Sequence, residues 1–424
     1  MKTMFKLKNY LLLAGLLALG FASCKKDNAG GINGTPGGSG PPAIASVHTV
    51  SKFVVDSSRK TTSTTYNSSG IATTTTNPDY TPNLTAYDST TVTGNLGNYY
   101  VIKGANLGST TSIAINGVSI YFNRALNSDN TVVFSIPTNI PYVQPQPNTI
   151  VVTTLHGKVT YTFTVLPPPP TITSVSDYDF SANSQFTLFG KGFSSVSAVK
   201  LRTTNDALTI LSKNDSTLVL QAPATSKVTE STLLFTYTSG ANANAQAAST
   251  AVFNDLDNAY VIFGNNNFQN AWGDNSWSAP SGVSANASHS GTASARAQYP
   301  AGAWQIEGWA NWYPSITYDP SYKFFSFWVK GGTVAHTLVL VGDQMKGGYG
   351  QVQNANAYAA QLITVPAKVW TFFKIPLAPP SSTNANALNF WANGSPAKQL
   401  GFFLQGQSGD VNETMYFDEV AFIK

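Results

Sequence analysis

Apolar and polar residues alternate in short segments along most of the chain, and these segments end at Gly, Asn or Pro. Five of them follow one another in the N-terminal half, at 99–107, 112–118, 131–137, 149–154 and 158–165. Asn116-Gly117 is a typical hairpin turn between two strands. No stretch between residues 43 and 166 shows the spacing of an amphipathic helix. The pattern predicts β-strands joined by tight turns.

The same order of strands and turns occurs a second time after Pro167–Pro170. Phe186–Phe193 matches Tyr100–Leu107, since each strand leads into G-x-G/N followed by Leu or Phe. A short strand and a second apolar run ending in x-Pro follow in both copies. The repeat resembles the IPT/TIG immunoglobulin-like domain, which implies two β-sandwiches, at 43–166 and 167–254.

The segment 255–424 has a different composition and no repeat partner. Its apolar runs predict strands at 259–263, 292–299, 323–330, 336–342, 369–375, 400–405 and 414–423. This number of strands favours a two-sheet jelly roll. Three stretches, at 291–296, 370–377 and 416–420, resemble carbohydrate-binding jelly rolls. The predicted fold class is therefore all-β, with two immunoglobulin-like sandwiches followed by a jelly roll.

The first residues have the features of a bacterial export signal. Three lysines precede an apolar run at 11–19, and Phe21-Ala22-Ser23-Cys24 follows. This ending resembles a lipobox, so residues 1–24 are predicted to be a lipoprotein signal with lipidation at Cys24; the alternative is a cleaved signal with an incidental cysteine. Cys24 is the single cysteine, which excludes an intrachain disulfide. The Gly- and Pro-rich segment 25–42 is predicted to be a flexible tether.

Charged residues make up only 10% of the chain, and the net charge is +4. A nucleic-acid-binding protein needs stripes of Lys and Arg to neutralise phosphates, and none is visible. The low charge also argues against acidic polysaccharides. Ser, Thr, Asn and Gly are abundant instead, as expected for an extracellular β-protein with hydroxyl- and amide-lined surfaces.

All eight tryptophans lie between residues 272 and 391. Indole is flat, rigid and amphipathic, and it can stack on the C–H face of an uncharged sugar ring. Trp304, Trp309, Trp312 and Tyr313 are the first candidates for such stacking, because they cluster among turn-forming residues. Trp272, Trp277 and Trp391 are further candidates. Each ring could instead fill the core, and Trp328 and Trp370 are assigned to the core or sheet surface.

Polar groups near the aromatic cluster would bond sugar hydroxyls; the candidates are Glu307, Asn311, Asp343, Gln344 and Tyr349. An alternative is an accessory glycosidase that uses Glu307 with a second carboxylate. The four histidines show no metal-binding spacing. No cofactor is predicted, apart from a weak candidate calcium site formed by Asp257 and Asp418.

The order of lipobox, tether, two repeats and Trp-rich jelly roll resembles the Bacteroidetes surface glycan-binding proteins of the B group. The resemblance implies a non-catalytic, monomeric lipoprotein at the outer membrane that faces outward. It would bind a neutral, β-linked plant polysaccharide, such as xyloglucan, mixed-linkage glucan or mannan, for a glycan importer and surface glycosidases. Lys25-Lys26-Asp27 is only partly like the acidic surface-export signals of this group, so the orientation stays open. A structural or adhesive surface protein is a further alternative.

Overall fold

The computed structural model describes residues 38–54, 58, 60–66, 72–78, 83–240, 242–350 and 352–424. The predicted signal segment with Cys24 and most of the predicted tether lie outside the described residues. The chain divides into two compact units at Leu166/Pro167. Within the part that the structure describes, no helix is long and apolar enough to cross a membrane.

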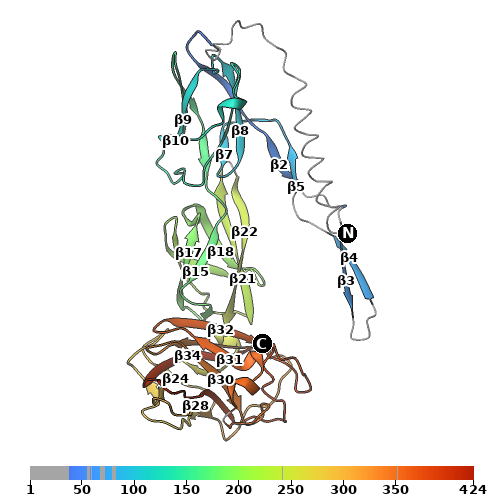
Figure 1. Cartoon of the computed structure of the whole chain (residues 1–424), viewed down its shortest axis with the longest axis vertical. Helices are drawn as coiled ribbons and strands as arrows, with labels where there is room; N and C mark the ends of the chain where they lie inside the picture. Colours follow the sequence, from blue (N-terminus) through green and yellow to red (C-terminus); the bar gives the residue numbers. More distant parts are fainter. Residues whose placement is uncertain are drawn as a thin grey trace. The chain divides into compact units, whose positions relative to one another are not determined.

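The first unit contains two four-stranded antiparallel sheets (Figure 1). One has the order β11-β8-β1-β6, with bounds Thr131–Ser135, Tyr99–Ala105, Ala43–Thr49 and Thr90–Thr91. The other has the order β10-β9-β12-β13, with bounds Val118–Ile120, Thr110–Ile115, Thr149–Thr154 and Gly157–Thr162. Alternate residues of both sheets meet in one hydrophobic cluster that includes Ile102, Ile113 and Val152. The predicted turn at Asn116-Gly117 joins β9 to β10, and both residues adopt positive φ, as a type I′ turn requires.

Smaller elements complete the first unit. β7 pairs with β14 in parallel, and two antiparallel pairs join β2 to β5 and β3 to β4. The 3-10 turn η2 spans Arg124–Leu126. The strand bounds are Thr93–Asn95, Thr164–Leu166, Ser51–Val54, Asn83–Ala86, Lys60–Tyr66 and Ala72–Pro78.

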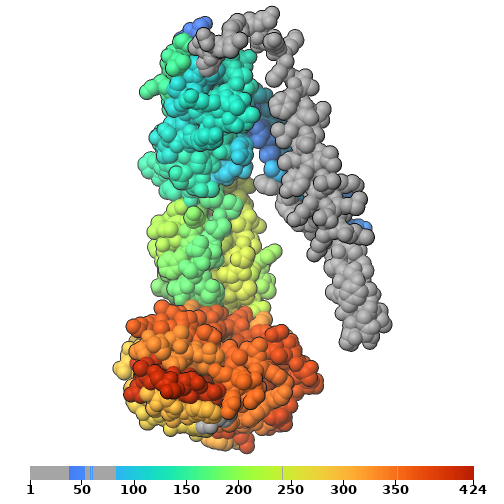
Figure 2. All heavy atoms as spheres, in the orientation of Figure 1, coloured from blue at the N-terminus to red at the C-terminus, as the bar shows by residue number. Residues whose placement is uncertain are grey.

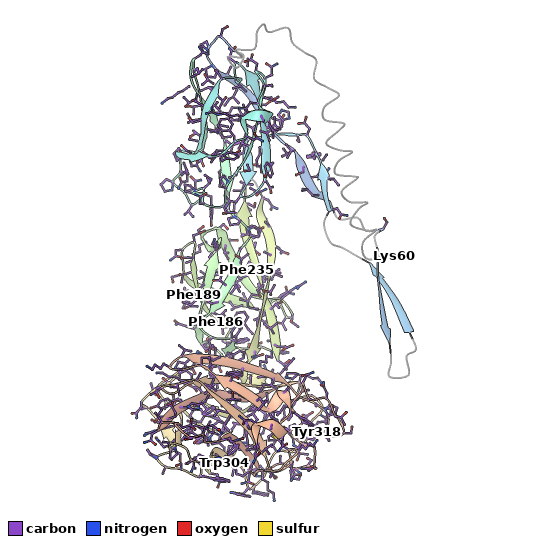
Figure 3. The ribbon with its side chains drawn as sticks, viewed as in Figure 1. Lys60, Phe186, Phe189, Phe235, Trp304 and Tyr318 are labelled. Atoms are coloured by element: carbon purple, nitrogen blue, oxygen red, sulfur yellow. The ribbon has the colours of Figure 1, made fainter. Side chains whose placement is uncertain are left out.

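The second unit begins with another sandwich, whose eight strands pair in the order β15-β17-β20-β19-β18-β21-β22-β16. Their bounds are Thr171–Val175, Gln185–Lys191, Thr217–Gln221, Ala207–Lys213, Val196–Leu201, Glu230–Ser239, Asn242–Asp255 and Asp179–Phe180, with the 3-10 turn η3 at Phe193–Ser195. The sheet encloses its own cluster of buried residues, among them Leu188, Phe235 and Phe253. Figure 3 labels Phe235 and Phe186 inside this sandwich.

The repeated G-x-G/N motif has the same structural cause in both sandwiches. A Cβ on Gly104 would lie 2.0 Å from the Ala43 carbonyl oxygen, and one on Gly190 would lie 1.8 Å from that of Thr171. The first strand of each sandwich therefore passes too close for any side chain. The third motif position, Asn106 or Gly192, adopts positive φ, which favours Asn and Gly.

The remainder of the second unit is a sandwich of two antiparallel sheets (Figure 1). In the larger sheet the long strand β34 (Glu413–Ile423) pairs with three strands, β23 (Tyr260–Gly264), β27 (Ser294–Tyr299) and β29 (Phe324–Lys330). Three further strands extend this sheet: β24 (Asn267–Phe268), β26 (Gly282–Ser284) and β32 (Trp370–Pro376). The five-stranded sheet has the order β25-β28-β33-β30-β31, with bounds Gly273–Asp274, Gln305–Ala310, Gln399–Leu404, His336–Gly342 and Leu362–Val365. The 3-10 turns η4, η5 and η6 span Leu256–Asn258, Asn354–Asn356 and Ala359–Gln361.

The predicted fold class is confirmed: the described residues form β-sandwiches, and their helical elements are short 3-10 turns. The seven strands predicted between residues 259 and 423 are all present, within two residues at each end. One important strand was not predicted. β28 lies inside the aromatic cluster at 304–313, which the sequence analysis placed in loops.

Candidate functional site

Successive side chains of β28 point to opposite faces of the five-stranded sheet, as in any strand. Trp309 points into the main core between the sheets, and Glu307 is bonded to it on the same side. Ile306 points the other way, into a separate small cluster with Phe403 and Val339. We call this other side, where Ile306, Gly308 and Ala310 alternate with the core residues, the outer face of the five-stranded sheet.

Trp309, Asn311 and Glu307 were predicted to bind sugar, and this prediction is wrong for all three because they are 0%, 0% and 2% exposed. Trp309 packs edge-on against Phe402 and Phe417, with ring centroids 5.3 and 5.8 Å away. The Asn311 side-chain amide donates to the Asn270 carbonyl and accepts from the Ser315 N–H, which holds the turn after β28. β28, and not a loop, positions Glu307 and Trp309, so both side chains point into the core.

The same correction applies to Trp272 and Trp391, which are 5% and 1% exposed. The Trp272 Nε1–H donates to the Tyr260 hydroxyl at 3.2 Å, and the Trp391 Nε1–H donates to the Ile316 carbonyl at 3.2 Å. Both rings belong to the main core, where each buried indole N–H has found an acceptor. Neither ring is available to stack on a ligand.

Glu307 is a buried carboxyl on the core side of β28. Its Oε2 accepts from the Ser276 hydroxyl at 2.8 Å, and its Oε1 accepts from the Trp309 Nε1–H at 3.3 Å. Burial raises the pKa of Glu307 to about 8, against the smaller opposing effect of the Ser276 hydrogen bond. Because the Glu307 carboxyl faces the core and is bonded there, it cannot reach a sugar on the outer face, so the glycosidase alternative loses its candidate acid.

Trp277 lies on the outer face at the edge of the sheet. Gly273 and Asp274 pair with Ala310 and Trp309, and the Trp277 N–H donates to the Ile306 carbonyl at 3.0 Å in the same register. Because directly opposed residues of antiparallel strands share a face, the Trp277 ring lies on the side of Ile306. The ring is 48% exposed.

Trp304 and Tyr349 also pack on the outer face, against the small cluster around Ile306 and Phe403. Trp304, labelled in Figure 3, lies edge-on to Phe403 and donates its Nε1–H to the Gly406 carbonyl. Tyr349 follows β30 in the chain, and Val352 and Ala357 pack on the same small cluster. A Cβ on Gly308 would lie 1.7 Å from the Tyr349 Oη, so the tyrosine side chain packs directly on this glycine.

Trp312 and Tyr313 are the most exposed of the predicted aromatic residues, at 61% and 87%. Trp312 follows Ile306, Gly308 and Ala310 in the outward-facing series, just beyond the end of β28. Six residues of extended chain separate it from Ile306, which corresponds to about 20 Å. Trp277, which lies opposite Ile306, and Trp312 are therefore separated by about 20 Å along β28. Between them, Gly308 and Ala310 are the β28 residues on the outer face.

Asp343 and Gln344 lie where they were predicted, immediately after β30. The Asp343 Oδ1 accepts from the Lys398 and Gln399 N–H groups, both at 2.9 Å, and its Oδ2 accepts from the Gln344 Nε2. The carboxylate thus anchors the start of β33. Their role toward a sugar stays a prediction.

The two weak calcium candidates have separate hydrogen-bonding roles. Asp257 is exposed and accepts from the Ala182 N–H at 2.6 Å. Asp418 is 1% exposed and accepts from the backbone N–H groups of His289, Ser290 and Glu419. A calcium ion held by this pair stays a prediction. Trp328, assigned to the core or sheet surface, is 6% exposed, and Trp370 is half-buried.

Comparison with known proteins gives partial similarities. No protein-family model matches the chain. A Bacteroides ovatus protein described as an IPT/TIG domain-containing protein is 32% identical over 124 residues, which make up 28% of this chain and only 25% of the relative's length.

Two solved structures of surface glycan-binding proteins are similar over most of the chain. PbSGBP-B from Prevotella bryantii has 13% identity and a TM-score of 0.46, covering 91% of this chain and 99% of that one. SGBP-B from a complex xyloglucan utilization locus in Bacteroides uniformis has 15% identity and a TM-score of 0.37, covering 78% and 96%. The chain is thus similar to an IPT/TIG domain-containing protein and to surface glycan-binding proteins.

Proposed function

We propose that the protein is a non-catalytic receptor for a neutral, extended polysaccharide, which binds along the outer face of the five-stranded sheet. The observation that carries the proposal is the pair of exposed indoles, Trp277 and Trp312, beside the two ends of β28. Tyr349 covers Gly308 between them, so the sugar chain would pass over Tyr349, while the two indoles supply stacking surfaces. Trp304, Tyr313 and Tyr349 adjoin the same path.

The spacing and charge of this face favour a particular class of glycan. A stretch of about 20 Å along one strand is nearly straight, which suits an extended β-linked chain better than a helical α-glucan. The chain has few charged residues, as expected for a neutral ligand. Xyloglucan, mixed-linkage glucan and mannan are therefore the first ligands to test.

The stacking energy of the aromatic rings sets the affinity that we expect for one glycan-binding site. At about 1–2 kcal/mol for each platform, taken from base–aromatic stacking, three rings contribute about 3–6 kcal/mol before the costs of ordering. This corresponds to dissociation constants from millimolar to tens of micromolar. A long polysaccharide offers many equivalent sites, so avidity compensates for weak single sites.

The rest of the chain fits a receptor held away from a membrane. In this proposal Cys24 carries the lipid anchor in the outer membrane, residues 25–42 form the tether, and the sandwiches at 43–166 and 167–254 act as spacers. Residues 255–424 bind the glycan at the cell surface and present it to an importer and to surface glycosidases. The protein acts as a monomer.

Affinity electrophoresis and calorimetry with the three polysaccharides test the proposal. We expect Trp277→Ala and Trp312→Ala each to weaken binding about tenfold with unchanged Tm. Tyr121→Ala is the matched control, because Tyr121 is 81% exposed but lies in the first unit. The absence of binding to every neutral polysaccharide would contradict the proposal, and release of reducing ends from a bound polysaccharide would show an enzyme instead.

A further inference from the structure

The second unit contains a polar cluster where its two sandwiches meet. Trp328 of β29 stacks near Tyr178, and its Nε1–H donates to the Asp177 Oδ1 at 3.2 Å. Asp177 follows β15 in the immunoglobulin-like sandwich, whereas His289 and Glu419 belong to the C-terminal sandwich. Figure 2 shows the first of these sandwiches, in green and yellow, resting on the orange and red surface of the second.

Three donor atoms converge in this cluster. The His289 Nδ1 lies 3.0 Å from the Glu419 Oε2 and 3.7 Å from the Asp177 Oδ2. The side chains are only 9%, 8% and 14% exposed, and the three ligand atoms lie within 4.8 Å of one another. In a tetrahedral site with bonds of about 2.0–2.1 Å, neighbouring donor atoms are about 3.3 Å apart, close to the mean of the two measured distances.

The hydrogen bond on the far side of the His289 ring fixes what Nδ1 presents to the carboxylates. The Nε2 lies 3.0 Å from the Ser176 carbonyl oxygen, which can only accept, so Nε2 carries the hydrogen. In the neutral ring Nδ1 then points a lone pair at two carboxylate oxygens. A lone pair facing two acceptors is unfavourable unless a cation or an additional proton lies between them. A ligating histidine typically donates its other N–H to a backbone carbonyl in this way.

Asp179 supplies an independent indication that a cation belongs here. It is 3% exposed; its Oδ1 accepts from the Asn254 amide at 2.6 Å, but its Oδ2 has no hydrogen-bond partner among the described residues. A buried oxygen without a partner is costly. Asp179 borders the same cavity of about 530 Å³ as Asp177, His289 and Glu419. This cavity gives an ion a route to the cluster.

The electrostatics of the cluster agree with a missing positive charge. Lys374 lies beside this region, but its Nζ donates to the Asn254 Oδ1 at 2.6 Å and to the Glu230 Oε2 at 2.8 Å. The buried carboxylates therefore outnumber the cations beside them.

We propose that Asp177, His289 and Glu419 bind one divalent transition-metal ion, of which zinc is the probe, at the junction of the two sandwiches. An imidazole ligand with carboxylates suits zinc, whereas calcium and magnesium prefer oxygen ligands alone. Glu419 is a non-glycine residue with φ 49° at a bulge in β34, and the bulge directs its side chain to the junction. The ion ties the immunoglobulin-like sandwich to the C-terminal sandwich.

The test is calorimetric titration of the chelator-treated full chain with Zn²⁺, followed by thermal unfolding with and without the ion. We expect one zinc ion to bind per cluster, and saturation to raise the Tm of the second unit by about 5 °C at a hundredfold excess over Kd. His289→Gln and Asp177→Asn should each weaken zinc binding at least tenfold and abolish the Tm shift. Ca²⁺ should give a much smaller shift.

His156→Gln is the matched control, since it removes an exposed imidazole from the first unit. Cys24 is common to every variant, so differences between variants report on the cluster alone. Zinc binding that is equally strong in His289→Gln and Asp177→Asn would overturn the proposal, as would the absence of saturable binding by the unmodified chain, which would leave an imidazolium–carboxylate cluster instead. Glycan binding is measured separately, so failure here says nothing of the receptor function.

Discussion

Trp309 and Trp312 are three residues apart in the sequence, yet Trp309 is fully buried and Trp312 is 61% exposed. The odd spacing places them on opposite sides of the extended chain at the end of β28, one toward the core and one toward solvent. Two residues of the same type in one short motif therefore have different roles.

This contrast gives the first prediction. Trp309→Ala should destabilise the protein by about 3–5 kcal/mol, because it opens a cavity among Phe402 and Phe417. Trp312→Ala should change stability by less than about 0.5 kcal/mol but weaken glycan binding. Chemical unfolding and calorimetry on the two variants measure both effects. An equal loss of stability in Trp312→Ala would assign this ring to packing.

The contact of Tyr349 with Gly308 gives a second prediction. Gly308→Ala should destabilise by about 1–3 kcal/mol, because the new methyl group occupies the position of the Tyr349 hydroxyl. Tyr349→Ala removes the obstruction, so in the double variant the alanine at 308 should cost much less. Urea unfolding of the four proteins forms a double-mutant cycle. Additive effects would show that the segment 343–361 does not hold Tyr349 on the sheet.

Glu307 predicts a pH dependence of stability. Its pKa is about 8 in the folded protein and 4.5 without the fold, so the folded state retains a proton that the unfolded state loses. The stability that the proton on Glu307 contributes is fully present below about pH 4.5 and is lost as pH rises through about 8. Over this range the free energy of unfolding falls by at most about 1.4 kcal/mol per pH unit. Glu307→Gln should flatten the curve in this window.

Unfolding free energies between pH 5 and 8 measure this effect as the difference between wild type and Glu307→Gln. The difference isolates Glu307 from the other buried carboxyls, such as Asp179, whose pKa is also raised by burial. Parallel curves for the two proteins would show that Glu307 is ionised in the folded state.

The repeated G-x-G/N motif predicts that alanine at either of its first glycines lowers the stability of the sandwich that contains it. Gly104→Ala and Gly190→Ala should each destabilise their own sandwich by at least about 2 kcal/mol, because the added Cβ meets a backbone oxygen that cannot move away alone. Gly273→Ala is the control, since no atom lies within 4 Å of its Cβ position. Thermal unfolding compares the three variants. A neutral Gly190→Ala would contradict the structural explanation of the motif.

Local patterns were sufficient to predict many of the strands and the repeat. The alternation in β8 and β17, the turn at Asn116-Gly117 and the glycines at 104 and 190 all reflect short-range geometry, which the sequence contains directly. The missed strand β28 is short and contains glycine and glutamate, both weak strand formers. Its two-residue alternation was a usable signal, because it separates Trp309 from Ile306 and Gly308.

The metal cluster had no detectable sequence signal. Asp177, His289 and Glu419 are separated by more than a hundred residues each, and no spacing rule connects them. Only the packing of one sandwich on the other brings their side chains together.

The sequence by itself determined that this is a β-protein with two related sandwiches and an aromatic-rich C-terminal sandwich, since these properties follow from local periodicity and composition. The tertiary structure decided which aromatic rings are buried. A sheet has two faces, and the sequence pattern of a short strand does not say which face another sheet will cover. Trp272, Trp309 and Trp391 lie buried between the two sheets, whereas Trp277, Trp312 and Tyr313 are exposed to solvent.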